Sequence, residues 1–303
     1  MKHFFIINPT AGQNDASITL PSEIEEIFRD RNESYEIYIT KSPKDSFRVA
    51  LEQSSNLDED TIFYACGGDG TSFDVLNGIV GKEHAFFGII PVGSCNDFLK
   101  TFPTYNFKDL KSVINGELRD IDVASANDLY FLNELNIGFD ALVNDDCNKS
   151  KIKEKSVKKA YNRAIFKNLI KFKTHNVNAL IHEKALPLKA LLIVLANGRY
   201  YGSKYCCAPF AVTDDGLLDL VVVNKISRIR FISLIKGYEK GEHLTNHKYD
   251  SIVHFERVDE IKLSSDEPMV TCLDGEIYYF NDIEIKNHHN ALKMLFPKEE
   301  NHE

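Results

Sequence analysis

The sequence contains no long apolar run. Nowhere do about 18 apolar residues follow one another, so a membrane-spanning helix is not expected. The first residues, MKHFFIINPTAG, hold an apolar stretch that stops at Asn8 and Pro9 and is too short for the core of a signal peptide. We therefore expect a soluble protein of the cytoplasm.

Paired cysteines and an excess of positive charge are also missing. The six cysteines lack the spacing of a zinc site, and in the cytoplasm we expect them to stay reduced and to pack as small apolar residues. The 45 acidic residues outnumber the 36 lysines and arginines, which leaves a formal net charge of -9. This balance argues against general affinity for nucleic acid.

Short apolar strands alternate with helical segments up to about Gly116. The expected strands are 3–7, 35–40, 61–65 and 85–90, and the expected helices lie near 21–31, 43–53, 71–80 and 96–101. Strands separated by helices are typical of a parallel sheet with helices on its faces. We predict an α/β nucleotide-binding domain with a Rossmann-like parallel sheet over residues 1–117.

Beyond about residue 118 the pattern is rich in strands, with helical segments only near 155–172 and 228–238. Many strands without regular crossover helices indicate an antiparallel sandwich or barrel. We therefore predict a second, β-rich sandwich domain over residues 118–287. We expect the final segment, about 288–303, to pack back on the first domain.

Four polar motifs directly follow the four expected strands of the first domain. They are NPTAG (8–12), Thr40, GGDGT (67–71) and PVGSCND (91–97). In a parallel sheet the ligand site lies outside the carboxyl ends of the strands. The shared position of the motifs therefore predicts one binding site, and it carries more weight than any single motif.

The GGDGT motif has the composition of a phosphate cradle. Successive glycines allow several backbone N–H groups to point at one anion, and a helix that begins near Thr71 adds the positive end of its dipole. Asp69 would repel phosphate unless a divalent cation lay between them, so it favours a magnesium nucleotide over bare phosphate. A tight turn with a solvated acid is the alternative.

The neighbouring motifs each allow two interpretations. NPTAG is either a plain loop or a second wall of the same cradle, with Asn8 reaching the nucleotide. In PVGSCNDF, Gly93 would allow close approach and Ser94 would offer a hydroxyl to the nucleotide. Asn96 and Asp97 would cap the following helix, which is a sufficient explanation for both without any role in binding.

Two acidic turns follow in the second domain. TDDGLLDL (213–220) places three carboxylates within six positions, which either bind a hard cation or lie solvated. CLDGE places Asp274 and Gly275 at a hairpin turn with Glu276 directly after it. The alternative to a plain hairpin is a carboxylate on a rigid turn that accepts a proton from a substrate hydroxyl.

Taken in order, NPTAG, GGDGT, PVGSCNDF, NIGFDA, DDGLLD and LDGE resemble the motif series of the diacylglycerol kinase catalytic-domain family, in particular its soluble bacterial lipid kinases. The resemblance extends from Asn8 to the terminal ALKMLFP. It implies an ATP-binding domain, a β-rich lipid-substrate domain and an interdomain cleft, with ATP and Mg²⁺ as cofactors. The implied reaction transfers the γ-phosphate of ATP to the hydroxyl of diacylglycerol or a related lipid alcohol.

The resemblance also implies roles for single residues. Glu276 would be the general base, and Asp69 would orient the catalytic Mg²⁺ with support from Asp97 and Asp122. A structural Mg²⁺ would use the Asp215 side chain and the carbonyls of Val212 and Leu217. The ATP contacts would come from Asn8, Pro9, Thr10, Ala11, Gly12, Thr40, Gly67, Gly68, Asp69, Gly70, Thr71 and Ser94.

The sequence leaves the family pattern just after GGDGT. The family continues there with x-Asn-Glu, whereas this chain has Phe73 and Asp74. Ser94 also stands where a threonine is usual and keeps the hydroxyl. Because the first departure removes a polar contact to the nucleotide, it bears on ATP affinity and nucleotide preference.

Residues 149–173 form a basic segment, with nine lysines and one arginine against a single acid. Lysines alone would be an ordinary solvated face, but apolar residues among them are typical of a helix at a membrane interface. With the lipid-kinase resemblance, we expect peripheral contact with the anionic inner surface of the membrane. The residues expected at that surface are Lys155, Lys159, Arg163, Phe166 and Ile170.

Other functions remain open at this point. GGDGT is shared with the NAD kinases, so an NAD kinase or a sphingoid or ceramide kinase of the same superfamily is the alternative enzyme. A non-catalytic regulator that binds lipid or nucleotide would explain why Phe73 and Asp74 depart from the kinase pattern. Such a regulator would not need the carboxylates of Asp69 and Glu276. The sequence specifies neither the acceptor lipid nor its acyl chains, and it neither requires nor excludes a homodimer.

Overall fold

The computed structural model describes residues 1–12, 15–93, 95–151 and 157–298, without the side chains of 150–151 and 157–162. The chain forms two compact units. The first comprises Met1–Val123, Leu129–Leu132 and the segment from His288, and the second comprises Ala124–Asp128 and Asn133–Asn287. The expected two-domain arrangement is thus confirmed. In the described part of the chain, no helix is long and apolar enough to cross a membrane.

The first unit is built on parallel strands. Their order is β4-β3-β1-β2, and the last part of β15 joins β4 in parallel through Met294 and Phe87. Every residue of β3 is buried, as expected for a strand covered on both faces. The strands are β1 (Lys2–Ile7), β2 (Ser34–Ile39), β3 (Thr61–Gly67), β4 (Ala85–Pro91), β5 (Glu117–Ala126), β6 (Leu129–Phe131) and β15 (Glu276–Phe296).

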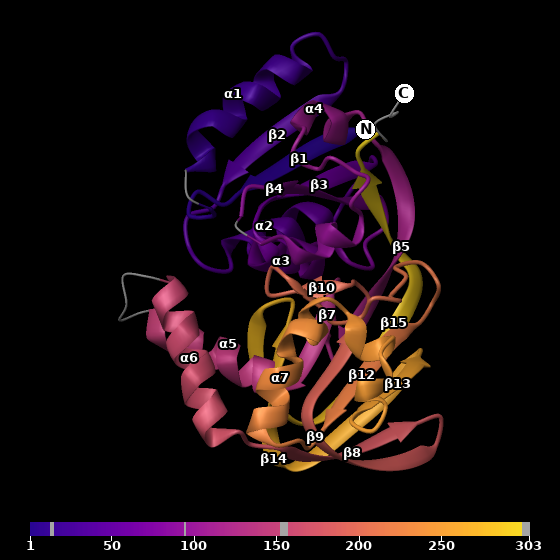
Figure 1. Cartoon of the computed structure of the whole chain (residues 1–303). Helices are drawn as coiled ribbons and strands as arrows, with labels where there is room; N and C mark the ends of the chain where they lie inside the picture. The colour runs from indigo at the N-terminus through magenta and orange to yellow at the C-terminus, as the bar shows by residue number, and fades with distance from the viewer. Residues whose placement is uncertain (13–14, 94, 152–156, 299–303) are drawn as a thin grey trace. The chain divides into compact units, whose positions relative to one another are not determined.

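Helices connect these strands, and Figure 1 shows α1 on one side of the strands and α2 with α3 on the other. The helix predicted near 21–31 begins earlier, because the Asp15 side chain caps it by accepting from the Ser17 amide and Pro21 lies inside it. The helical elements are α1 (Ala16–Phe28), α2 (Asp45–Ser54), α3 (Asp69–Ile79), the 3-10 helix η1 (Asp97–Thr101) and α4 (Leu110–Ile114).

The second unit is β-rich, as expected, and its strand pairs are antiparallel. The order is β13-β12-β9-β7-β14-β15, and β8 pairs with both β9 and β14. A separate two-stranded ladder joins β10 and β11. The strands are β7 (Glu134–Gly138), β8 (His175–Ile181), β9 (Lys184–Ala196), β10 (Tyr200–Tyr201), β11 (Tyr205–Cys206), β12 (Leu218–Asn224), β13 (Val253–Val258) and β14 (Glu260–Leu273).

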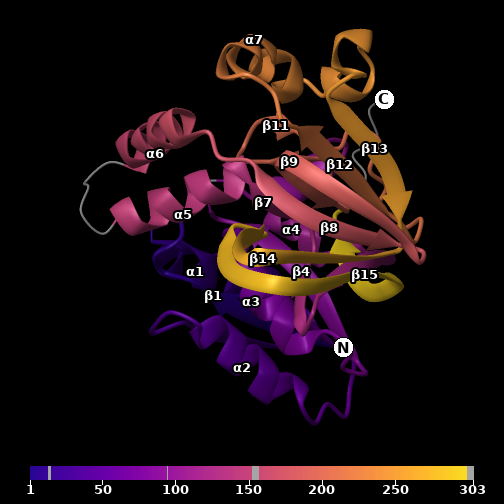
Figure 2. The same cartoon turned by 90° about the horizontal axis from the view of Figure 1, so that it is seen from below.

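Helix α5 is the longest of several elements of this unit that the sequence pattern did not predict. It buries Phe139, Val143 and Cys147, which are spaced four residues apart, although the rest of its sequence is polar. Figures 1 and 2 show it beside α6. The helical elements are α5 (Phe139–Lys151), α6 (Val157–Lys171), α7 (Arg228–Glu239) and the 3-10 helices η2 (Glu242–Leu244) and η3 (His247–Tyr249).

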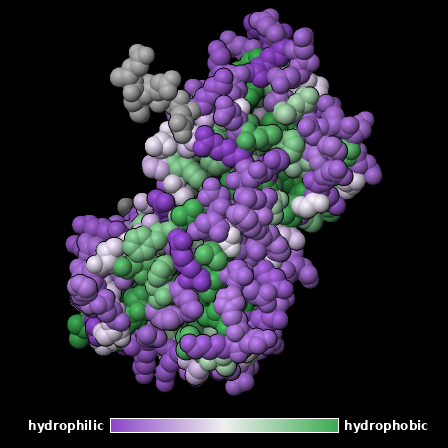
Figure 3. All heavy atoms as spheres, turned by 90° about the vertical axis from the view of Figure 1, so that its right-hand side faces the viewer, coloured by the Kyte–Doolittle hydropathy of each residue, from purple (hydrophilic) through white to green (hydrophobic). Residues whose placement is uncertain are grey.

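Each unit has its own apolar core. In the first unit, Phe5 stacks on Tyr64 with ring centroids 4.3 Å apart, and Phe296 from the end of β15 packs against Phe102 and Phe107. All six cysteines are free, and five of them are buried. Figure 3 shows that on one face of the molecule the apolar side chains gather in patches bordered by polar ones.

Candidate active site

Three loops of the first unit meet at the carboxyl ends of β1, β3 and β4. The Gly93 amide donates to the Gly67 carbonyl over 3.0 Å. A Cβ on Gly93 would lie 2.4 Å from the Gly68 Cα, and one on Gly12, whose φ is +79°, would lie 2.2 Å from the Val92 carbonyl oxygen. Glycine is therefore required for this close approach, and the loops NPTAG, GGDGT and PVGSCND form one surface.

Asp69 is the first residue of α3, so GGDGT leads from a strand into a helix and is not a hairpin turn. Its carboxylate accepts from the backbone amides of Asn96, over 3.0 Å, and Asp97, over 2.7 Å. Burial raises the pKa of Asp69, and the negative charge of Asp97 raises it further. The Asn96 side chain donates to the Gly67 carbonyl and does not cap η1, which corrects the expected capping role of Asn96.

The Asn8 side chain holds the first loop against α3. Its Nδ2 donates to the Thr71 hydroxyl over 3.1 Å, and its Oδ1 accepts from the amide and the hydroxyl of Thr10. Gly68 at the N-cap of α3 supplies no capping side chain. The positive end of this helix is therefore available to an anion.

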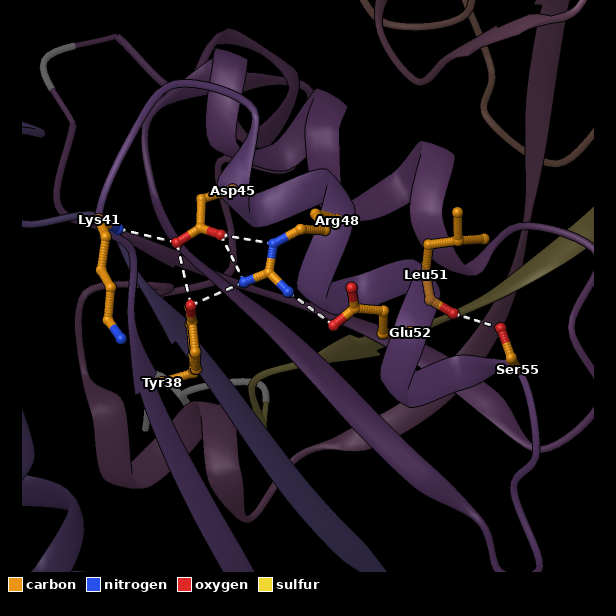
Figure 4. A network of polar contacts seen from close by, with 7 residues as sticks. All are labelled: Tyr38, Lys41, Asp45, Arg48, Leu51, Glu52 and Ser55. Atoms are coloured by element: carbon orange, nitrogen blue, oxygen red, sulfur yellow. Dashed lines mark hydrogen bonds and ion pairs between the residues drawn. The ribbon is translucent and has the colours of Figure 1, made fainter.

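Thr40 lies buried in the turn after β2, and its amide donates to the Ile7 carbonyl over 2.9 Å. The next turn is fixed by Asp45, which accepts from the Lys41 amide, the Tyr38 hydroxyl and the Arg48 guanidinium (Figure 4). The hydrogen bond from the Lys41 amide holds the pKa of Asp45 below its ordinary value. The network holds the backbone directly after Thr40 through the Lys41 amide.

The two residues that depart from the family pattern have structural partners. Phe73 is buried, and the Lys44 ammonium lies 5.4 Å from the centre of its ring. The same ammonium is 2.8 Å from the Asp74 carboxylate. Phe73 and Asp74 thus join the start of α2 to α3, a role that sequence reasoning missed because Lys44 is 30 residues away.

The other residues expected near Asp69 are not all brought to it. Asp97 interacts electrostatically with Asp69 and forms an ion pair with Lys100 over 2.5 Å. Asp122 is fully buried and accepts from the His289 ring, over 2.9 Å, and the Asn290 amide, over 2.8 Å. Ser94 lies outside the described residues.

Glu276 begins β15 and is half-buried, directly after the hairpin turn that Asp274 and Gly275 form between β14 and β15. The Asp274 carboxylate accepts from the amides of Asn133 and Glu134 over 3.0 and 2.9 Å. These two hydrogen bonds connect the turn to the start of β7, and they hold the backbone next to Glu276 in place. Sequence reasoning named Glu276 but missed the part of Asp274.

Comparison with known proteins agrees with these motifs. Residues 2–126 match the diacylglycerol kinase catalytic domain, and residues 133–296, more than half of the chain, match the YegS C-terminal NAD kinase beta sandwich-like domain. The chain belongs to the diacylglycerol kinase catalytic-domain family. It is accordingly a lipid kinase, a transferase.

Individual relatives of this lipid kinase cover nearly its whole length. The protein named diacylglycerol kinase of Bacillus subtilis strain 168 is 27% identical over 97% of this chain and 96% of its own. That of Staphylococcus saprophyticus is 28% identical over 89% and 87%. A crystal structure of a candidate diacylglycerol kinase from Bacillus anthracis Sterne superposes with a TM-score of 0.76, at 25% identity and over 98% and 97% of the two chains.

The turn where the kinase family implies a structural Mg²⁺ holds an arginine instead. Arg257 lies 2.9 Å from the Asp215 carboxylate and 3.1 Å from that of Asp219, and it donates to the Phe210 carbonyl over 2.7 Å. The other Asp215 oxygen accepts from the Leu217 amide. The Asp215 side chain as it stands therefore offers a structural Mg²⁺ no free oxygen, because one oxygen pairs with Arg257 and the other accepts from Leu217. The expected use of the Val212 and Leu217 carbonyls stays a prediction.

Of the residues expected at the membrane, Lys159, Arg163, Phe166 and Ile170 belong to α6. Arg163 is exposed, as are Phe166 and Ile170 with 67% and 57% of their surface. Lys155 lies outside the described residues, and the Lys159 side chain does as well. Sequence reasoning missed two further exposed apolar residues on α7, Ile229 and Ile232, which are 83% and 58% exposed.

Proposed function

We propose that this kinase transfers the γ-phosphate of ATP to the hydroxyl of diacylglycerol or a related lipid alcohol, giving a phosphatidate-type product. The observation that carries the proposal is the meeting of three glycine-containing loops at a helix N-terminus that has no capping side chain. Such a surface suits phosphate groups. The choice of diacylglycerol as the phosphate acceptor is based on the relatives that are named diacylglycerol kinase.

The start of α3 fits a magnesium ion that is held mainly by the nucleotide. Mg²⁺ usually takes one or two carboxylates together with phosphate oxygens, and in the described residues no group of three or more His, Cys, Asp or Glu side chains could hold a metal. Asp69 and Asp97 would hold it, and a cation there would favour the charged form of Asp69. When bound, Mg²⁺ would neutralise phosphate charge.

The remaining work falls to groups of the chain itself. Phosphoryl transfer mainly requires position and charge stabilisation, which the backbone amides at Gly67–Thr71 and the loop of Asn8 would provide. Glu276 would accept the proton of the lipid hydroxyl as the new bond forms. The Asp274 carboxylate would keep the Glu276 turn in place through its two backbone hydrogen bonds.

The proposal is tested with the purified kinase, labelled ATP, Mg²⁺ and a panel of diacylglycerol, ceramide, sphingoid base and NAD. We expect label in the lipids and none in NAD. Glu276→Gln should lower kcat about 10²- to 10⁴-fold while ATP still binds, because the proton acceptor is lost. The matched control is Glu256→Gln, an exposed glutamate on β13. Near-normal turnover of Glu276→Gln would remove it from the role.

We further propose that the kinase meets its lipid at the anionic inner surface of the membrane through α6. Exposed Phe166 and Ile170 next to basic side chains support this. Sedimentation with phosphatidylglycerol vesicles should be weak and should fall with added salt. Changing Lys155, Lys159 and Arg163 to Glu should abolish it, and equal binding after that change would contradict the proposal.

A further inference from the structure

A lysine occupies a backbone conformation that favours glycine, in the turn between β2 and α2. Lys44 has φ +65° and ψ 6°, in the left-handed region that residues with a side chain rarely adopt. Hydrogen bonds hold the backbone there: the Lys44 carbonyl accepts from the Arg48 amide over 3.1 Å, and the neighbouring Asp45 is fixed by its own contacts (Figure 4). A lysine at a strained position indicates that its side chain has a function.

The Lys44 side chain is held against α3. Its ammonium lies 2.8 Å from the Asp74 carboxylate and 5.4 Å from the centre of the Phe73 ring, so an ion pair and a cation–π contact fix its position. The two members of the ion pair differ in exposure: 54% of the Lys44 side chain is exposed, against 11% of the Asp74 side chain. A ligand that approaches this pair therefore meets the ammonium first.

The ammonium lies on the side of the glycine loops toward which a nucleotide would extend. The strand order is β4-β3-β1-β2, so the turn after β2, with Thr40 and Lys44, is next along the sheet edge to the glycine loops after β3 and β1. Toward β4 the surface is closed, because Gly93 packs directly against Gly68. Asp74 is about 7.5 Å along the axis from the start of α3. A nucleotide with its phosphates at that start would carry its ribose past Lys44.

We propose that the Lys44 ammonium donates a hydrogen bond to a ribose hydroxyl of the nucleotide, and that Asp74 positions the ammonium for this contact. The acid at the position of Asp74 would by itself accept from a ligand, whereas the exposed group of the pair is a donor. A ribose hydroxyl oxygen can accept from it. Lys44 thereby favours ribonucleotides over deoxyribonucleotides. The identity of the nucleotide as ATP rests on the proposed function.

The first test replaces Lys44 by methionine, which keeps an unbranched side chain against Phe73 and removes the charge. Binding of ATP with Mg²⁺, measured by calorimetry without lipid, should weaken about tenfold. Lys41→Met removes the charge of an exposed side chain in the same turn and is the control, which should change the affinity less than twofold. Equal losses in the two variants, or no loss in Lys44→Met, would overturn the proposal.

The second test changes the nucleotide. The analogues 2′-deoxy-ATP and 3′-deoxy-ATP each lack one ribose hydroxyl, and one of them should bind the parent protein about tenfold more weakly than ATP. In Lys44→Met the same difference should fall below about twofold, because the two changes remove one shared contact. Losses that multiply, or equal binding of ATP and both analogues by the parent protein, would contradict the contact.

A methyl ether of the same hydroxyl distinguishes the ammonium from the carboxylate as its partner. The ether keeps an oxygen that accepts and loses the hydrogen that donates. With Lys44 as the partner, the O-methyl analogue should bind at least about threefold more tightly than the deoxy analogue. If the Asp74 carboxylate were the partner, the ether would bind as weakly as the deoxy analogue, and that result would overturn the assignment to Lys44.

The positioning role of Asp74 is tested by Asp74→Asn, which removes the charge that holds the ammonium. ATP binding should weaken about threefold in the parent protein and no further when Lys44 is already methionine, because Asp74 acts through Lys44. Circular dichroism verifies that each variant folds. An equal loss in both backgrounds would show that Asp74 acts without Lys44 and would overturn its positioning role.

Kinase activity separates this inference from the proposed function. With diacylglycerol as acceptor, Lys44→Met should raise the KM for ATP about tenfold with kcat within about twofold, because a ribose contact is the same before and during phosphoryl transfer. A lowered kcat with an unchanged KM would overturn the inference. Selective binding of ribonucleotides by a protein that phosphorylates no lipid would support Lys44 and overturn the proposed function. Lipid phosphorylation with equal use of ATP and both deoxy analogues would do the reverse.

Discussion

Replacing Arg257 by alanine should destabilise the second unit and make its stability depend on added magnesium. The change removes three contacts, to the carboxylates of Asp215 and Asp219 and to the Phe210 carbonyl. Breaking a fully buried ion pair costs about 3–5 kcal/mol. The Arg257 side chain is 36% exposed and Asp219 can take up a proton, so we expect about 2 kcal/mol.

The pH dependence of this loss follows from Asp219. Burial raises its pKa to about 6, so its charged form is disfavoured in the folded state and stability falls as the pH rises from about 4 through 6. Without Arg257 the folded-state pKa should rise further, which extends the fall to higher pH. The loss caused by Arg257→Ala should therefore be larger at pH 8 than at pH 5.

Thermal unfolding without nucleotide, followed by circular dichroism, is the assay. We expect Arg257→Ala to lower the midpoint by about 4–8 °C at pH 8. Magnesium or EDTA should leave the midpoint of the parent protein unchanged, whereas magnesium should partly restore that of Arg257→Ala by binding the vacated carboxylates. The control is Asp214→Asn, a change at the exposed neighbouring acid. A parent midpoint that rises with magnesium, together with a harmless Arg257→Ala, would refute the reasoning.

Other changes test the glycine loops and two acids whose pKa is raised by burial. Gly93→Ala should weaken ATP binding at least about tenfold in calorimetry because its Cβ would meet the Gly68 Cα; unchanged affinity would contradict this. Asp69→Asn should cost about 1–3 kcal/mol in urea unfolding, since its NH₂ would face a backbone amide such as that of Asn96; a neutral effect would argue against the two hydrogen bonds. Burial raises the pKa of Asp140 to about 6, so the free energy of unfolding should fall by up to about 3 kcal/mol as the pH rises from 4 to 7. Asp140→Asn should abolish this fall, and parallel pH profiles of stability for the two proteins would contradict the prediction.

The elements of the first unit were predictable where the pattern was local. Strand β3 is a continuous apolar run, and α3 follows it at once. The start of α1 was missed because it depends on the cap at Asp15. Helix α5 was missed because its buried residues are separated by polar ones.

The candidate site was predictable as a set of loops but not as a set of contacts. The motifs after the strands lie together because parallel strands end at one edge. The partners that fix them are distant in sequence: Asp274 binds amides 140 residues away, and Arg257 reaches Asp215 across 42 residues. Such pairs carry no periodic signal, so the guanidinium in place of a metal could not be foreseen from the VTDDGL turn.

The return of β15 to the first unit sets the order in which a ribosome can complete the two units. The core around β4 includes Leu292, Met294 and Phe296, so an emerging chain that stops at Leu132 lacks part of it. At about 5–20 residues per second, synthesis of the intervening unit takes on the order of ten seconds. During that time the nascent first unit exposes the apolar edge of β4. The first unit, whose synthesis begins first, is thus the unit whose core is completed last.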